Sequence, residues 1–170
     1  YDLVGTKVFD ANLKITKNQS LKTLEGLESL TVLEGDFPLL GTSLTIQDNP
    51  ELQEIDALSN LSFVGGNLRI IGNKELSNID GLSGLIDIGG SLVILENDGL
   101  LNLAGLGHLT SIERGLDISF NERLFDCCAI QDLLANLGAI GVLTRITENP
   151  SECSSVNEIL DGCKITTFIN

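Results

Sequence analysis

A pattern of the form Ile-x-x-Asn recurs along the chain and constrains the fold more than any other feature of the sequence. The intervals between successive asparagines are 31, 24, 24, 24 and 28 residues. Three equal intervals in succession indicate one structural unit that is repeated along the chain. The pattern occurs at Ile15/Asn18, Ile46/Asn49, Ile70/Asn73, Ile94/Asn97, Ile118/Asn121 and Ile146/Asn149.

The spacing of the apolar residues changes within each unit. After the asparagine, an apolar residue comes at every third position, as at Leu76, Ile79 and Leu82. Before the next asparagine the apolar residues alternate with others, as at Leu92 and Ile94. Alternation is typical of a strand with one buried face, and a spacing of three is typical of a 3₁₀-like segment. Each unit is therefore expected to hold one short strand and one winding segment.

Stacking such units buries apolar residues that a single unit leaves exposed, so we expect a β-solenoid, a parallel β-helix with turns of about 24 residues. Its strands are predicted near residues 12–17, 43–48, 67–72, 91–96 and 115–120. The whole chain, 1–170, is expected to form one solenoid domain, with repeats over 1–125 and a C-terminal cap over 126–170. The cap is expected to contain a last strand near 142–147.

The recurring asparagines and the glycine pairs are both expected to have structural roles. The asparagines are predicted to form an inward-facing ladder, because a side-chain amide both donates and accepts hydrogen bonds and can satisfy the backbone where the chain leaves the sheet. The ladder residues are Asn18, Asn49, Asn73, Asn97, Asn121 and Asn149. The pairs Gly65-Gly66 and Gly89-Gly90 precede two predicted strands, and we expect them to form sharp turns that other residues do not adopt.

The repeat resembles that of receptor L domains, the leucine-rich ligand-binding modules of insulin- and epidermal-growth-factor-type receptors, and of their bacterial surface relatives. The residues that carry the resemblance are 76–97, LSNIDGLSGLIDIGGSLVILEN, and segments 52–73 and 100–121 repeat them with changes. The third copy departs at Glu113-Arg114, where the other two have a glycine pair. The resemblance implies a right-handed leucine-rich-repeat solenoid with a binding or adhesion role, and it does not carry over a ligand.

All four cysteines lie in the predicted cap, at Cys127, Cys128, Cys153 and Cys163. An even number confined to one region predicts two disulfides and an oxidising, extracellular or cell-surface location. The neighbours are not expected to bridge each other, because that bond is strained. The pairings 127–153 with 128–163, and 127–163 with 128–153, both remain open. A zinc site is the alternative, but the spacing lacks a C-x₂-C pair.

Two helices are predicted in the same cap. Apolar residues spaced at Ile130, Leu133, Leu134 and Leu137 indicate an amphipathic helix. Ser155-x-x-Glu158 is a capping box, which predicts a second short helix that ends before Gly162.

The outward face of the predicted sheet supplies the main candidate site. Ile71, Val93 and Leu95 are expected to form an exposed apolar cluster, and such clusters often mark an interface. Phe120 lies at the edge of this face and is a candidate anchor. The remaining candidates on the face are Lys14, Thr45, Arg69, Asp117 and Ser119. A second candidate is the loop 34–42, EGDFPLLGT, which lengthens one unit by seven residues and contains Phe37.

Composition excludes several functions. The formal net charge is −14, from 10 basic and 24 acidic residues, which argues against binding nucleic acid or anionic lipid. No apolar run is long enough to cross a membrane, so no membrane insertion is expected. The single histidine, His108, and the lack of catalytic motifs predict that the protein is not an enzyme and uses no cofactor. The acidic column Glu25, Asp56 and Asp80 is expected to cap turns, with a weak calcium site as the alternative.

The sequence therefore predicts a non-catalytic, extracellular binding or adhesion module. It would recognise a protein or a glycan through the outward face of the sheet or through the 34–42 loop. The alternative is a structural spacer of a longer cell-surface protein, whose partners would be further domains of the same polypeptide.

Overall fold

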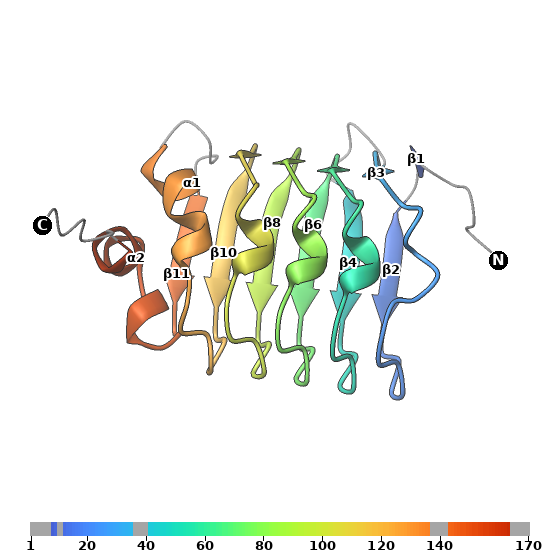
Figure 1. Cartoon of the computed structure of the whole chain (residues 1–170), viewed down its shortest axis with the longest axis horizontal. Coiled ribbons are helices and arrows are strands. Elements are labelled where there is room, and N and C mark those ends of the chain that lie inside the picture. The colour runs from blue at the N-terminus through green and yellow to red at the C-terminus, as the bar shows by residue number, and fades with distance from the viewer. Residues whose placement is uncertain (1–7, 10–11, 36–40, 137–142, 164–170) are drawn as a thin grey trace, which may run out of the picture.

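The computed structural model describes residues 8–9, 12–35, 41–136 and 143–163. They form two parallel β-sheets with a few short helical segments (Figure 1). The larger sheet has the order β11-β10-β8-β6-β4-β2 and the smaller has the order β1-β3-β5-β7-β9. Each strand therefore pairs only with its counterpart from the preceding or following segment of the chain, an arrangement compatible with a parallel β-solenoid. We call the segment from one strand of the larger sheet to the next a layer.

The strands of the larger sheet lie within one residue of the predicted ranges. They are β2 (Leu13–Thr16), β4 (Thr42–Gln47), β6 (Asn67–Ile71), β8 (Ser91–Leu95), β10 (Gly115–Ser119) and β11 (Leu143–Thr147). Parallel pairing places equivalent residues side by side, so that Ile46, Ile70, Ile94, Ile118 and Ile146 form one row.

The smaller sheet was not predicted. Its five strands are β1 (Val8–Phe9), β3 (Val32–Leu33), β5 (Phe63–Val64), β7 (Asp87–Ile88) and β9 (Ser111–Ile112). The apolar spacing of three extends to Val64, Ile88 and Ile112, and so predicts that they belong to the winding segments. Two residues are too short to display an alternation, so only pairing between layers identifies these strands.

The winding segments contain the expected 3₁₀ turns. These are η1 (Asp56–Leu58), η2 (Asp80–Leu82), η3 (Ala104–Leu106) and η4 (Cys128–Ile130). Each of the last three is preceded by a side-chain oxygen that accepts a backbone N–H two residues on, as Asn78 does from Asp80 at 3.0 Å. Asp56 and Asp80 occupy the first turns of η1 and η2. No cluster of ligating side chains able to hold a metal ion occurs in the described part of the chain.

The core is a continuous column of Leu, Ile and Val side chains between the two sheets. In the layer after Asn73, every third residue from Leu76 to Ile88 is fully buried. Burial of this kind contributes roughly 1.5–3 kcal/mol for each side chain. The regular column therefore fixes how each layer stacks on the next.

The glycine pair before β8 lies at a bend, as predicted, but the reason for glycine is a close approach between layers. Neither Gly89 nor Gly90 has a left-handed backbone. A Cβ atom on Gly89 would lie 2.5 Å from the carbonyl oxygen of Gly65 in the preceding layer, and one on Gly90 would lie equally close to the backbone of Gly66. The glycines are required because the layers approach each other closely at this corner.

The asparagine column forms a hydrogen-bonded ladder along the edge where the strands end. The backbone N–H and Nδ2 of Asn73 both donate to Oδ1 of Asn97, at 3.1 and 3.2 Å. The same pair of bonds joins each of the six asparagines to the next. Nδ2 of Asn73 also donates to the carbonyl oxygens of Ile46 and Ile71. The four inner asparagines, Asn49, Asn73, Asn97 and Asn121, are fully buried.

A left-handed residue precedes every ladder asparagine. The six positions are Lys17, Asp48, Gly72, Glu96, Phe120 and Glu148, with φ between 55° and 65°. Only one of them is glycine, although the left-handed region is unfavourable for residues with a Cβ atom. The bond from the asparagine Nδ2 back to the carbonyl two residues earlier, seen at Asn73, Asn97 and Asn121, closes this turn.

The C-terminal end of the stack is covered by η4, α1 (Gln131–Ala135), η5 (Ser151–Cys153) and α2 (Val156–Gly162). The predicted capping box is present, since Glu158 N–H donates to Ser155 Oγ at 3.2 Å. Helix α2 includes Gly162 and is one residue longer than predicted. Leu137, the last apolar position of the first predicted helix, lies outside the described residues. None of the described helices has the length and apolarity that a membrane span requires.

We predict that Asn97→Ala lowers the free energy of unfolding by roughly 3 kcal/mol, because it leaves several buried donors and acceptors without partners. Asn18→Ala is the matched control. Asn18 is exposed and, among the described residues, donates only to Asn49, so its loss should cost about 1 kcal/mol. Urea unfolding of both variants measures the difference, and equal losses would contradict the ladder's role.

Candidate functional site

A hollow of about 300 Å³ lies on the outward face of the larger sheet. It spans three neighbouring strands, β8, β10 and β11, whose order places them at the C-terminal end of the sheet. The hollow is lined by Ser91, Leu92, Val93, Gly115, Leu116, Asp117, Leu143, Thr144 and Arg145. We call it the sheet-face hollow.

The hollow is shaped by a missing side chain and by an exposed one. Gly115 pairs with Ser91 on one side and Leu143 on the other. A Cβ atom on Gly115 would lie 2.7 Å from the carbonyl oxygen of Leu143, so glycine permits the close approach of β11. The Leu143 side chain is 75% exposed. Leu143 therefore forms an apolar side of the hollow. Gly115 has no side chain to fill the space beside it.

A polar cluster borders the same hollow. Ser119 Oγ donates to Asp117 Oδ1 at 2.6 Å, and Thr147 Oγ1 donates to Ser119 Oγ at 3.3 Å. Arg145 lies 3.8 Å from Asp117 Oδ2 and donates through Nε to Thr147 Oγ1 at 3.4 Å. The Arg145 side chain is 56% exposed, so this ion pair contributes little to stability. Its donors remain accessible to a partner.

Phe120 extends this cluster at the end of β10. It is 44% exposed and has a φ of 58°. The Arg145 guanidinium lies 5.8 Å from the centroid of its ring, a cation–π distance. Phe120 thus lies at the edge of the face, as the sequence predicted, but it contacts a residue that sequence reasoning did not single out.

The exposed apolar cluster expected at Ile71, Val93 and Leu95 requires correction. Ile71 is only 9% exposed and is a buried hydrophobic residue, although it lies outside the main core cluster, and the other two are half-buried. The pairing register places Ile71 beside Leu95, and Leu95 beside Ser119. Neighbouring side chains on a flat parallel sheet shield one another, which the sequence pattern does not reveal.

The other predicted face residues lie on strands away from the hollow. Lys14 is exposed on β2, Thr45 is 7% exposed on β4, and Arg69 is half-buried on β6. Val93 and Asp117 line the hollow, and Ser119 is a fully buried member of the polar cluster beside it. Phe37 and most of the 34–42 loop lie outside the described residues.

Several site residues were missed by sequence reasoning. Leu143, Arg145 and Thr147 alternate along β11 in the same way as the predicted face residues of the other strands. That alternation could have identified them. The sequence places this last strand in the cap, however, so its outward residues are not among the predicted residues of the face.

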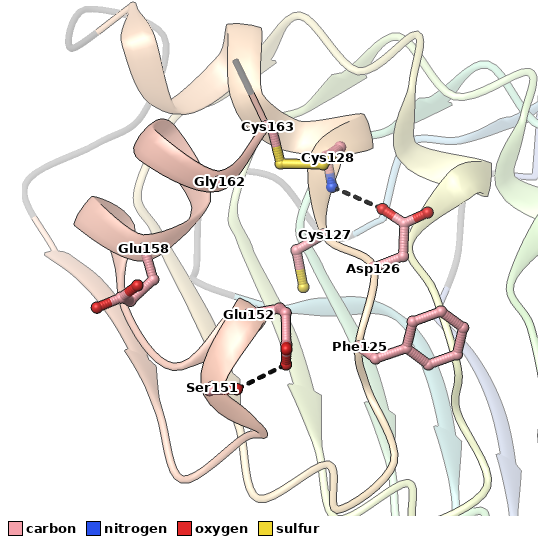
Figure 2. A pocket seen from close by; sticks show the side chains of 9 residues that line it. All are labelled: Phe125, Asp126, Cys127, Cys128, Ser151, Glu152, Glu158, Gly162 and Cys163. Atoms are coloured by element: carbon pink, nitrogen blue, oxygen red, sulfur yellow. Dashed lines mark hydrogen bonds between the residues drawn. A yellow bond between two sulfur atoms is a disulfide. The ribbon is translucent and has the colours of Figure 1, made fainter. Parts of the chain in front are cut away.

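A second hollow, of about 460 Å³, lies within the C-terminal cap. Phe125 and Asp126 line it from the segment before η4, and Ser151 and Glu152 line it from η5 (Figure 2). The Ser151 hydroxyl donates to Glu152 at 2.8 Å and holds the pKa of that carboxyl below its ordinary value. Glu152 therefore remains ionised at neutral pH.

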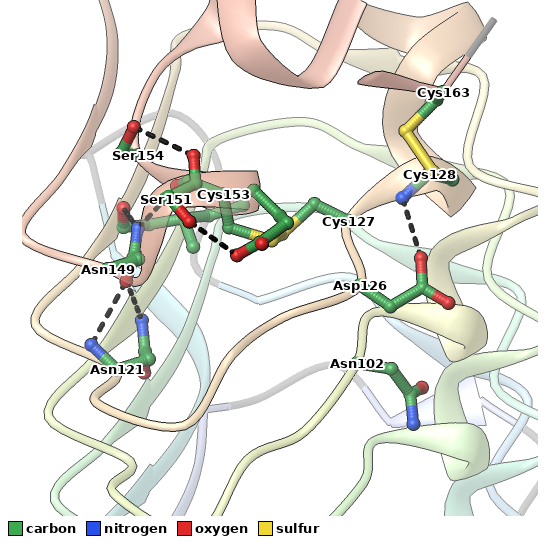
Figure 3. Close-up of a disulfide and its surroundings, with 12 residues drawn as sticks. Asn102, Asn121, Asp126, Cys127, Cys128, Asn149, Ser151, Cys153, Ser154 and Cys163 are labelled. Carbon is green, nitrogen blue, oxygen red and sulfur yellow. Dashed lines mark hydrogen bonds between the residues drawn. A yellow bond between two sulfur atoms is a disulfide. The ribbon is translucent and has the colours of Figure 1, made fainter.

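Cysteines of both disulfides line part of this cap hollow. They join Cys127 to Cys153 and Cys128 to Cys163 (Figure 3), which decides between the two pairings that the sequence left open. Because Cys127 and Cys153 are buried while Cys128 is exposed, the first bridge lies inside the cap and the second nearer its surface.

The single histidine, His108, which the sequence analysis considered in relation to catalysis, is exposed. A nitrogen of its ring lies 2.9 Å from the Ser83 carbonyl oxygen. This contact belongs to the winding segments and lies apart from either hollow.

Comparison with known proteins gives no relative. No family model matches the chain, and neither a curated protein nor a solved structure matches it. The function has to be inferred from the residues alone.

The pairing predicts the result of thiol titration on double variants. Cys127→Ser/Cys153→Ser removes one bridge completely and should leave no free thiol under denaturing conditions. Cys127→Ser/Cys163→Ser breaks both native bridges and should release two thiols. Loss of one bridge should cost roughly 3–4 kcal/mol of stability, given loops of 26 and 35 residues. The opposite pattern of free thiols would indicate the alternative pairing.

Proposed function

We propose that this protein is a non-catalytic, extracellular binding module that recognises a protein or a glycan through the sheet-face hollow. Its fold would be a right-handed leucine-rich-repeat solenoid similar to receptor L domains. The two parallel sheets, the repeated 24-residue register and the two disulfides support this proposal.

The observation that carries the proposal is the combination of an apolar hollow and an accessible polar cluster on one rigid sheet. A volume of about 300 Å³ is at the small end of ligand pockets. It suits one side chain or one sugar ring projecting from a larger partner. The Arg145 donors and the exposed Leu143 side chain offer that group both hydrogen bonds and apolar contact.

Electrostatics limits the partner further. Asp117 and Arg145 have opposite charges at the hollow, so the hollow has little net charge of its own. The chain as a whole is strongly acidic, with a net charge of −14, and repels polyanions at long range. A neutral or basic protein segment or a neutral glycan therefore fits better than an acidic one.

A spacer role is the second candidate, and one observation favours it. The near-complete burial of Ile71 and the half-burial of Val93 and Leu95 leave a flat face with little exposed apolar surface. A rigid stack of this kind could hold other domains apart without binding a ligand. This role predicts that the isolated chain has no partner.

The test compares two face variants, Val93→Glu and Arg145→Glu, with a matched control, Ile86→Glu. Ile86 is 46% exposed and lies on a winding segment away from the larger sheet. Pull-down of extracellular proteins and a glycan array should identify a partner for the wild type and for the control. We expect each face variant to lose at least about tenfold in affinity, because it puts a carboxylate into the contact.

All four proteins should have equal melting temperatures, so that a lost partner is not an unfolded sample. If both face variants bind as the wild type does, the sheet-face hollow is not the binding site. If the wild type binds nothing in either screen, the spacer role is favoured.

A further inference from the structure

Two segments of the sequence have the form Asn-x-Ser, the acceptor motif for an N-linked glycan. They are Asn18-Gln19-Ser20 and Asn60-Leu61-Ser62. N-linked glycans are added to secreted chains, in which disulfides also form, and the two disulfides of the cap are consistent with that location. The two asparagines differ in how the folded chain holds them.

Asn60 lies in a turn that directly follows η1, and its side chain is exposed. The next residue, Leu61, is fully buried in the core, and Ser62 is half-buried. The buried Leu61 fixes the turn on the surface of the stack. A bulky hydrophilic group on Asn60 can therefore extend into solvent without displacing core side chains.

The Asn60 amide keeps its packing contact when it carries a sugar. In the described part of the chain, its Nδ2 donates one bond, to the Glu28 carbonyl oxygen of the preceding layer at 2.8 Å. A primary amide nitrogen has two hydrogens, so a linked sugar replaces one and leaves the other for Glu28. The Ser62 hydroxyl of the motif donates to the Thr31 carbonyl oxygen of the same layer at 3.1 Å.

Asn18 is a poorer acceptor, although it is also exposed. Its backbone N–H and its Nδ2 both donate to Oδ1 of Asn49, at 3.0 and 2.9 Å. Asn49 is fully buried, so a sugar on Asn18 Nδ2 would have to fit against the first step of the ladder. Asn60 belongs to a turn outside the ladder.

An exposed apolar side chain lies beside the Asn60 motif. Ile86 is 46% exposed, and its backbone N–H donates to the Ser62 carbonyl oxygen from the following layer at 3.0 Å. An exposed apolar side chain on a surface favours contact with other proteins. A glycan at Asn60 would shield it, because glycans are bulky and solubilising.

The motif lies on the opposite side of the core from the sheet-face hollow. Figure 1 shows η1, the teal coil, on one side of the strands of the larger sheet. The strand residues that belong to the core, such as Leu68 and Ile70, are fully buried, and the hollow is on the outward face. A glycan in the turn after η1 therefore leaves the hollow open.

We propose that Asn60 is the acceptor of an N-linked glycan and that Asn18 is not. The donor is an oligosaccharide joined to a polyprenyl diphosphate. Nδ2 of Asn60 forms a bond to the anomeric carbon and loses one proton, while the bond from that carbon to the diphosphate oxygen breaks and the diphosphate leaves with the electron pair. Glycosylation at Asn60 rests on the extracellular location proposed above and is independent of binding at the hollow.

The test is secretion of the full chain from eukaryotic cells behind a signal peptide, followed by mass spectrometry. A peptide-N-glycosidase removes the glycan and converts the acceptor asparagine to aspartate, which identifies the modified residue. We expect one glycan on the wild type, at residue 60, and none on Asn60→Gln or Ser62→Ala. Ser62→Thr keeps the hydroxyl and should keep the glycan. Ser20→Ala removes the other motif and is the matched control, with the glycan unchanged.

Equal melting temperatures of the variants after deglycosylation show that a lost glycan does not reflect misfolding. Wild type that is secreted with both disulfides and no glycan on Asn60 would overturn the proposal. A glycan on Asn18 that Ser20→Ala removes would overturn it as well. Because the readout is a covalent mass, it requires no binding partner, so failure of the proposed binding function leaves this result interpretable.

Discussion

Hydrogen bonds between stacked asparagines determine how the layers of this protein join. Each inner asparagine accepts two bonds from the layer before it and donates to the layer after it, at distances between 2.9 and 3.4 Å. The same side chains satisfy the carbonyl groups of strands that end beside them. Buried polar groups are costly unless they are paired, and one residue type at one position meets that requirement in every layer. The left-handed backbone before each asparagine is tolerated because this network holds it.

The proposed binding surface, the sheet-face hollow, follows from this construction. Within the stack, all outward side chains of one register position lie in a row, so a hollow forms only where the row is interrupted. Gly115 interrupts it beside the exposed Leu143, and the polar cluster around Asp117 borders that place. The hollow therefore depends on a local exception to these regular rows.

Much of the fold could be predicted because its determinants are periodic. The alternation at Leu92 and Ile94 and the spacing of three after Asn73 identify strands and 3₁₀ turns without reference to distant contacts. The smaller sheet could not be predicted, since its two-residue strands exist only through pairing with other layers. The candidate site was predicted in part. Val93 and Asp117 were identified by alternation, but the exposure of Ile71 depends on how neighbouring strands pack, and the disulfide pairing depends on the path of the cap.

Native-state hydrogen exchange tests the central role of the ladder most directly. The backbone amides of Asn49, Asn73 and Asn97 donate to side chains of the next layer, so they should exchange only when the whole stack unfolds, with free energies equal to that of global unfolding. The amide of Ser59, which closes a 3₁₀ turn by a local bond to Asp56, should exchange faster through local opening. If the three asparagine amides exchanged as fast as Ser59, the ladder bonds would open while the stack stayed folded, and the asparagines would not be what holds the layers together.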